Sequence, residues 1–146
     1  MTTQTLQVVC PACDSTNRLP AERDPKAGRC GRCKQPLFAG APAALTGARF
    51  QKHLANSDLP LVVDFWAAWC GPCRAMARIF DKAAATLEPA ARFIKIDADA
   101  EPQLASQLGV RGIPALFLFR NGKVAAQHAG LADLSLLRSW VEPARA

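Results

Sequence analysis

The chain has 146 residues and a formal net charge of +6, and half of its residues are hydrophobic, enough to build a core. This length suits one ordinary domain, or one domain with a small appendage. The charge divides into +3 over residues 1–40 and +3 over residues 41–146. A charge so diffuse argues against nucleic acid as a partner, and no apolar run approaches the roughly 18 residues that a membrane helix needs.

The first ten residues have neither the basic start nor the long apolar run of a secretory signal. We therefore expect a cytoplasmic protein that does not associate with membranes. In a reducing compartment, paired cysteines are usually metal ligands or catalysts and not structural staples. The six cysteines all fall into C-x-x-C pairs, which are Cys10/Cys13, Cys30/Cys33 and Cys70/Cys73.

Residues 1–40 form the first predicted domain. They contain few large apolar side chains and much proline, glycine and charge, so they cannot close a core of their own. A fold this small needs a metal or a disulfide to hold it. Residues 38–44, with Gly40 and Pro42 as breakers, are predicted to form a linker into a second domain, which we place at residues 41–146.

The second domain shows an alternation of helix and strand patterns. Hydrophobic periodicity predicts a short helix ending near residue 56, a strand at 61–66, a helix from 72 to 88, a strand at 92–97, a short helix at 102–108 and a strand at 116–119. Asn121-Gly122 predicts a hairpin turn into a strand at 123–128, and a helix around Leu134 to Val141 closes the chain. This order predicts an α/β fold in which helices flank a central mixed sheet.

The first four cysteines have the spacing C-x2-C-x16-C-x2-C, which is typical of a four-thiolate zinc site. Two residues between ligands let one tight turn present both sulfurs at adjacent corners of a tetrahedron. Gly31 allows the positive φ that such a turn often needs, and Arg29, Arg32 and Lys34 offset the negative charge of the thiolates. We predict one structural Zn²⁺ and no organic cofactor, with the ligands Cys10, Cys13, Cys30 and Cys33.

Cys70 and Cys73 have different surroundings. They follow a predicted buried strand and open a helix, so a thiolate at Cys70 would lie at the helix N-terminus, where backbone N–H groups lower its pKa. We predict that Cys70 is the nucleophile and that Cys73, one turn further in, is the more shielded thiol that resolves the mixed disulfide. Only His53 and His128 remain as soft metal ligands, and neither lies nearby in sequence, so redox chemistry is favoured over a second metal site.

Asp64 is the only charged residue in the predicted strand at 61–66. Burial of a lone carboxylate is costly and raises its pKa toward neutrality, which would suit Asp64 to exchange a proton with Cys73. The alternative is an exposed carboxylate near the end of the strand.

These motifs together resemble a known family. Residues 63–73, VDFWAAWCGPC, look like the active-site stretch of thioredoxins, and residues 110–115, VRGIPA, look like their second signature. The two C-x-x-C turns within residues 10–33, here called knuckles, are similar to those of the zinc ribbon that precedes this domain in the thioredoxin-2 type of bacteria. The resemblance implies a thioredoxin fold behind a small zinc ribbon, and the activity of a cytosolic disulfide reductase.

The resemblance also implies roles for single residues. Pro114 would be cis and would face the cysteine pair, the Ile113 backbone would bind an extended substrate strand, and Trp66 would pack beneath the site. The implied partners are oxidised protein substrates and a thioredoxin reductase as electron donor, and we expect a monomer. The implied substrate-binding residues are Trp69, Gly71, Pro72, Ile113, Pro114 and Gly130.

Two departures from the family pattern carry expectations of their own. Many thioredoxins have a lysine close to the buried carboxylate, on the strand where this chain has Phe93, so we expect Asp64 to titrate differently here. The first strand of the domain should lie near residues 43–46, although Pro42-Ala-Ala-Leu is a poor strand sequence.

Three functions are compatible with these motifs. A disulfide reductase is favoured because Gly71-Pro72 between the cysteines is associated in this family with a low potential. An oxidant or isomerase would usually have a histidine there and a signal peptide. In a third function, the ribbon recruits a protein or nucleic acid. Strong oxidant would also be expected to oxidise the zinc thiolates and eject the metal.

Overall fold

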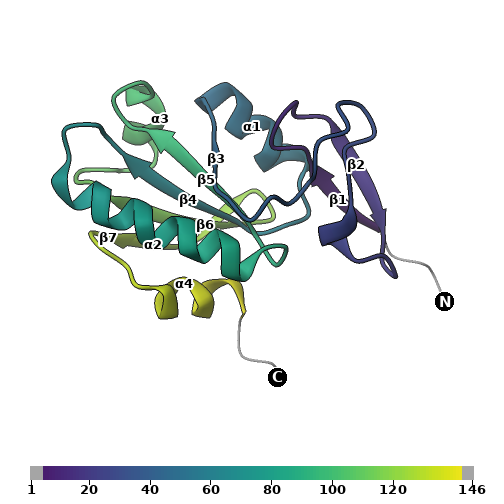
Figure 1. Cartoon of the computed structure of the whole chain (residues 1–146). Coiled ribbons are helices and arrows are strands. Elements are labelled where there is room, and N and C mark those ends of the chain that lie inside the picture. The colour runs from purple at the N-terminus through teal and green to yellow at the C-terminus, as the bar shows by residue number, and fades with distance from the viewer. Residues whose placement is uncertain (1–4, 143–146) are drawn as a thin grey trace.

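The computed structural model describes residues 5–142, so the ends of the two predicted domains, residues 1–4 and 143–146, lie outside the described part. Two sheets carry the fold (Figure 1). In chain order the elements are β1 (Thr5–Val9), β2 (Thr16–Pro20), a 3-10 turn (Pro25–Ala27), β3 (Ala43–Ala44), α1 (Gly47–Asn56), β4 (Leu61–Trp66), α2 (Gly71–Leu87), β5 (Arg92–Asp97), α3 (Pro102–Gln107), β6 (Ala115–Arg120), β7 (Lys123–Ala129) and α4 (Leu134–Val141).

The larger sheet is mixed and has helices on both faces. Its strand order is β3-β5-β4-β6-β7, with β3, β5 and β4 parallel and with β6 and β7 antiparallel to their neighbours. Side chains of neighbouring strand residues point to opposite faces. Val62 and Phe93 therefore join the core under α2 and α4, whereas Val63 and Ile94 join the core under α1 and α3. The predicted α/β fold is confirmed.

The predicted elements are confirmed in type and lie within about two residues of their expected bounds. The hairpin between β6 and β7 turns at Asn121 and Gly122, which both have positive φ, as this dipeptide predicts. The first strand of the domain is only two residues long, at Ala43–Ala44, but it pairs with β5 in the expected place.

The zinc ribbon is the β1–β2 hairpin and the loops that follow it, at one end of the larger sheet (Figure 1). The predicted linker at residues 38–44 packs against both parts of the chain that it connects. Phe38 is buried in the ribbon's core together with Leu59, which precedes β4. The backbone N–H of Gly40 donates to Glu88, next to the end of α2. Leu59 supplies apolar contact that the ribbon cannot provide for itself.

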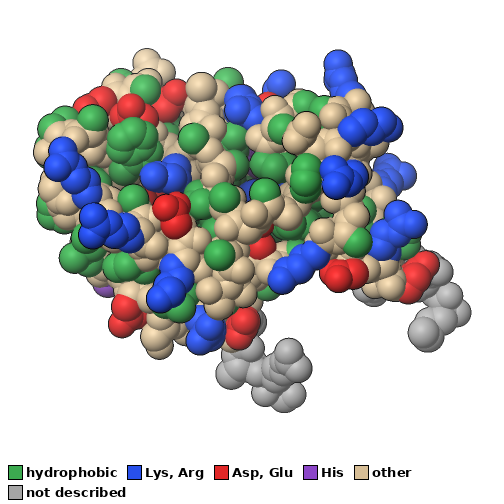
Figure 2. All heavy atoms as spheres, viewed as in Figure 1, with side chains coloured by type: hydrophobic (Ala, Val, Ile, Leu, Met, Phe, Trp, Pro, Cys, Tyr) green, Lys and Arg blue, Asp and Glu red, His purple; other side chains and the backbone are tan. Residues whose placement is uncertain are grey.

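Charged side chains are spread over the face of the molecule in Figure 2, where Lys and Arg occur over both the ribbon and the larger sheet. This distribution agrees with the diffuse charge of the sequence. Among residues 5–142, no helix combines the length and the apolar character needed to cross a membrane.

Candidate functional site

The cysteine pair lies where the chain leaves the sheet and enters a helix. Strand β4 ends at Trp66, and Cys70 is the N-cap residue of α2. The Cys70 Sγ accepts a hydrogen bond from the backbone N–H of Cys73 at 3.2 Å, and Pro72 occupies the first turn, where no backbone donor is required. The two residues form a disulfide with their Cα atoms 5.3 Å apart. A sulfur at position 70 therefore faces the positive end of the helix.

The disulfide is enclosed on its inner side and framed by exposed residues. Cys70 and Cys73 are each 4% exposed and pack with Ala67, Trp66 and Ile113. In the disulfide form the two residues are therefore equally buried. Trp66 packs beneath the pair, as the resemblance implied.

The loop that precedes β6, the strand next to β4, also faces the pair. The Ile113–Pro114 peptide bond is cis, as the resemblance implied, and the carbonyl oxygen of Ile113 lies 3.6 Å from the Cys70 Sγ. Gly130 donates its backbone N–H to the Pro114 carbonyl at 2.8 Å. Gly130 has φ of 89°, a conformation that favours glycine. Ile113, Pro114 and Gly130 therefore form one hydrogen-bonded rim beside Cys70.

An open groove of about 540 Å³ begins at this rim. Trp69 forms one wall and is 71% exposed, and its indole N–H donates to the Asp99 carboxylate at 2.9 Å. This bond fixes the orientation of an exposed aromatic ring. The groove is lined by residues of the loop before Pro114 and of α3, among them Pro102, Ala105, Val110, Gly112 and Ile113.

Asp64 is fully buried on β4, and neither of its carboxylate oxygens has a hydrogen-bond partner among the described residues. Burial raises its pKa from the ordinary 3.8 to about 7, and the nearby Lys95 lowers it in part. The expectation of a buried, near-neutral carboxylate is confirmed, and the exposed alternative is wrong.

The expected absence of a lysine beside Asp64 is wrong. Phe93 is a core residue paired with Val62, but the next position on the same face of β5 is Lys95, which is paired with Asp64. The ammonium group of Lys95 also lies 5.4 Å from the centre of the Trp66 ring. The family's lysine was matched to Phe93, whereas the residue beside Asp64 is Lys95, two positions further along β5.

A second cavity, of about 230 Å³, lies beside Cys73. Cys73 and Lys95 both line it, so charge and solvent can approach Cys73 from the side away from the groove. The remaining lining residues are Trp66, Ala67, Ala68, Arg74 and Ala77.

The other four cysteines form a compact cluster in the ribbon, with all sulfurs within 4.8 Å of one another. The Cys10 and Cys33 sulfurs are 3.6 Å apart, as are the Cys13 and Cys30 sulfurs. A zinc tetrahedron with Zn–S bonds of about 2.3 Å has sulfurs roughly 3.8 Å apart, so the donors fit zinc in type, number and spacing. Within residues 5–142, this is the only group of His, Cys, Asp or Glu side chains arranged to share a metal.

The two knuckles of the ribbon have the same backbone geometry. In each, the N–H of the residue after the second cysteine, Asp14 or Lys34, donates to the carbonyl of the first cysteine at 3.0 Å. These two residues have φ of 67° and 68°. The prediction that Gly31 has positive φ is therefore wrong, because the turns place this conformation at Asp14 and Lys34. Backbone N–H groups of Cys33 and Arg32 lower the pKa of the Cys30 thiol to about 6, which favours the thiolate form that binds metal.

Sequence reasoning missed a polar network between the ribbon and the rest of the chain. Asp14, on the ribbon, contacts Arg49 and His53, both on α1. The signal for this network is the spacing of Arg49 and His53, which are four residues apart and therefore share one face of a helix. His128 lies outside this network, and its Nε2 contacts the carbonyl oxygen of Leu131.

Comparisons with known proteins agree with this architecture. Residues 41–143 match the family model "Thioredoxin", and residues 9–35 match "Thioredoxin 2, N-terminal". Thioredoxin C-3 of Corynebacterium nephridii is 37% identical over 135 residues, covering 92% of each chain. The thioredoxin of Rhodospirillum rubrum is 42% identical over 98 residues, covering 67% of this chain and 94% of its own.

A solved structure of chloroplastic thioredoxin z is similar with a TM-score of 0.64 and 29% identity, covering 69% of this chain and 91% of that chain. The family model extends over most of the chain, and the Corynebacterium relative extends over both its parts. The chain therefore belongs to the thioredoxin family, whose members are disulfide oxidoreductases.

Proposed function

We propose that Cys70 and Cys73 carry a reductive disulfide exchange. The Cys70 thiolate attacks one sulfur of a substrate disulfide, which forms a mixed disulfide and releases the first substrate thiolate. The Cys73 thiolate then attacks the Cys70 sulfur and releases the second substrate thiolate. Two electrons pass from the dithiol to the substrate, and the enzyme is left with the Cys70–Cys73 disulfide seen here. The position of this disulfide at the N-terminus of α2 is the observation that carries the proposal.

Asp64 is proposed to accept the proton of Cys73 before the second step. A pKa of about 7 lets a carboxyl group both take up and release a proton near neutral pH. Its unpartnered oxygens leave it free for this exchange, directly or through water in the interior.

The substrate is proposed to lie along the rim and groove beside Cys70. An exposed aromatic ring at Trp69 and an open groove beside a cis proline suit an extended polypeptide segment. Residues on both sides of the disulfide would contact the substrate, namely Trp69, Gly71, Pro72, Ile113, Pro114 and Gly130.

The ribbon is proposed to bind a single Zn²⁺ through its four cysteine thiolates, Cys10, Cys13, Cys30 and Cys33. Zinc with four protein ligands has no position open to substrate, so its contribution would be structural. The ribbon contacts the ends of the sheet where β4 and β5 begin, whereas Cys70 follows the opposite end of β4. We place the boundary between the two domains at residues 40 and 41.

The family acts on protein disulfides, generally with a thioredoxin reductase as electron donor. For this chain we propose the same donor, a cytoplasmic location and a monomeric state, with no role for nucleic acid. The modest net charge, +3 in each of the two predicted domains, supports the last point.

The proposal is tested by reduction of insulin disulfides with dithiothreitol as electron source. Wild type should accelerate the reaction, and Cys73→Ser should lose turnover while accumulating a mixed disulfide through Cys70, because the resolving thiol is gone. Mass spectrometry detects that adduct, and Cys70→Ser is the matched control that should form none. Turnover by Cys73→Ser at the wild-type rate would contradict the mechanism.

A further inference from the structure

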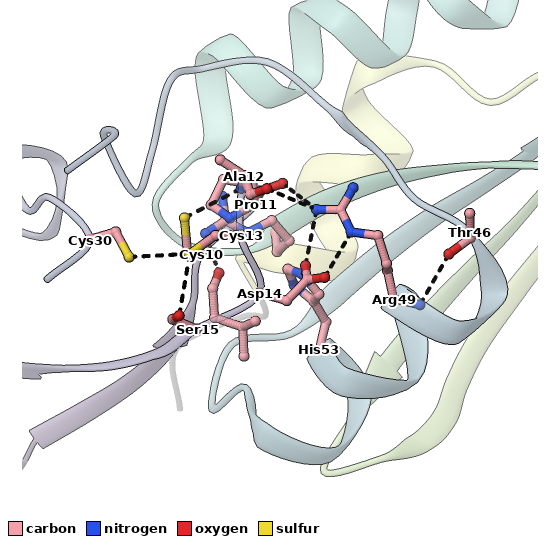
Figure 3. A network of polar contacts seen from close by, with 12 residues as sticks. Cys10, Pro11, Ala12, Cys13, Asp14, Ser15, Cys30, Thr46, Arg49 and His53 are labelled. Atoms are coloured by element: carbon pink, nitrogen blue, oxygen red, sulfur yellow. Dashed lines mark hydrogen bonds and ion pairs between the residues drawn. The ribbon is translucent and has the colours of Figure 1, made fainter. Parts of the chain in front are cut away.

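One side chain of the thioredoxin domain reaches into the ribbon. Arg49 on α1 makes a two-pronged ion pair with Asp14, in which its Nε and Nη2 lie 2.8 and 3.0 Å from the two carboxylate oxygens (Figure 3). The Asp14 side chain is 9% exposed and that of Arg49 is 33% exposed, so the carboxylate is screened from solvent while the guanidinium is half-buried. Such two-pronged pairs fix geometry as well as adding energy.

The same guanidinium also contacts the turn between two cysteines. Its Nη2 donates to the carbonyl oxygen of Pro11 at 2.9 Å and approaches that of Ala12 at 3.5 Å. Pro11 and Ala12 are the two residues between Cys10 and Cys13, and Asp14 directly follows them. Arg49 therefore contacts the first knuckle both inside the turn and at its exit.

Neighbouring residues of α1 hold Arg49 in place. His53, on the same face of α1, is 1% exposed and contacts Asp14 at 3.1 Å. Between them, Phe50 packs edge-on against Phe119 of the central sheet, with ring centres 5.2 Å apart. The helix that holds the first knuckle is thus anchored in the core of the thioredoxin domain.

The second knuckle is held differently. The backbone N–H of Gly31 donates to the side chain of Asn17 at 2.9 Å, and the Lys34 ammonium donates to the Gly31 carbonyl at 2.8 Å. These partners all belong to the ribbon. The second knuckle is therefore braced from within, whereas the first depends on a residue 35 positions away in the other domain.

We propose that Arg49 is a positioning residue for the zinc site: it holds the first knuckle in the shape in which Cys10 and Cys13 bind the metal. This inference rests on the proposal that the four cysteines bind zinc. Removal of residues that orient metal ligands typically costs about 10–100-fold in affinity. Zinc retention by the ribbon thus depends on the thioredoxin domain.

The test is a competition between the full-length protein and a chromogenic zinc chelator. Arg49→Met should lower the zinc affinity about 10–100-fold. Arg49→Lys should lose less, since an ammonium group keeps the charge but cannot bond both carboxylate oxygens and the Pro11 carbonyl together. Lys52→Met removes the same charge from an exposed position of α1 and should leave the affinity unchanged.

Thermal unfolding with zinc or with EDTA separates a role at the metal from a general role in stability. The rise in melting temperature on zinc binding should be smaller in Arg49→Met than in wild type. A melting temperature lowered equally with zinc and with EDTA, together with an unchanged zinc affinity, would overturn the proposal. If Arg49→Met does not fold, Arg49→Lys decides by the same comparison. A wild-type protein that holds no zinc would instead refute the zinc assignment itself.

Discussion

At the scale of single residues, the active site combines a disulfide of ordinary local structure with a carboxylate in an unfavourable environment. The disulfide between Cys70 and Cys73 needs only a turn and a helix start. Asp64 is different, because a buried carboxylate without hydrogen bonds is unfavourable when ionised. Lys95 lowers its pKa only in part, which leaves the value about three units above that of a free aspartate. The ionised carboxylate therefore destabilises the fold. We infer that its role is catalytic and consists of proton exchange with Cys73.

Asp64→Asn should therefore stabilise the fold at high pH and impair turnover. Because the pKa of Asp64 is raised on folding, its contribution to stability is full below about pH 4 and is lost as pH rises to about 7. Above pH 7 the wild type loses stability on the order of 4 kcal/mol through ionisation of Asp64. The amide of Asp64→Asn does not ionise, but its burial without hydrogen bonds is itself unfavourable, so we expect the free energy of unfolding to rise by about 1–3 kcal/mol at pH 8.

Urea unfolding at pH 4 and pH 8 measures this gain, which should vanish at the lower pH. Asp81→Asn, at an exposed position of α2, is the matched control and should show no such dependence. Insulin reduction by Asp64→Asn should fall about 100-fold, the lower range for loss of a general base. Equal stability of both proteins at pH 8 would contradict the burial argument.

At the scale of elements, α2 determines the chemistry of the nucleophile. Cys70 caps this helix and accepts a backbone N–H bond there, so an ionised sulfur would be stabilised by the same groups that cap any helix N-terminus. Arg74 lies in the first turn and lines the cavity that Cys73 also lines. Its positive charge adds to the field of the helix.

Arg74→Glu should accordingly raise the pKa of Cys70. The substitution removes an attraction for the thiolate and adds a repulsion, and both changes disfavour the ionised sulfur. The pH dependence of alkylation by iodoacetamide in the reduced protein reports this pKa. Arg78→Glu, one turn further along α2 and exposed, should shift it less. A shift of equal size in both variants would assign the effect to overall charge and not to the helix start.

At the scale of the whole molecule, a buried ion pair of the thioredoxin domain also contacts the ribbon. Arg92, at the start of β5, is 2% exposed and contacts Glu88 at 3.4 Å. Its guanidinium also donates to the Val9 carbonyl at 3.3 Å and lies 4.6 Å from the centre of the Phe38 ring. Val9 and Phe38 belong to the ribbon, so undocking the ribbon would remove partners from a buried cation. The two parts should therefore unfold together.

Arg92→Leu should lower the free energy of unfolding by about 3–5 kcal/mol, because it leaves Glu88 buried without its partner. The double variant Glu88→Leu/Arg92→Leu should recover part of this loss, since no buried charge remains. Guanidinium unfolding gives both values, and Arg78→Leu, at an exposed site, should stay within about 0.5 kcal/mol of wild type. Two separate transitions in the wild type would contradict cooperative unfolding.

Much of the fold and of the candidate site could be predicted from the sequence because the signals are local. Helix and strand periodicity depends on residues a few positions apart, and the zinc knuckles and the pair Cys70/Cys73 each depend on a C-x-x-C spacing. The burial of Asp64 followed from the apolar residues on either side of it. The resemblance then added the cis bond at Pro114, which spacing alone does not indicate.

The tertiary structure alone decided which distant residues meet. Lys95 was missed beside Asp64 because the register between β4 and β5 is set by packing of the whole sheet, and a shift by two residues keeps every side chain on its face. Arg49 reaches a knuckle 35 residues away, and Arg92 reaches Val9 across 83 residues. Local sequence determines each element, but the burial of a charge depends on which surfaces dock against it, and that is a property of the folded chain.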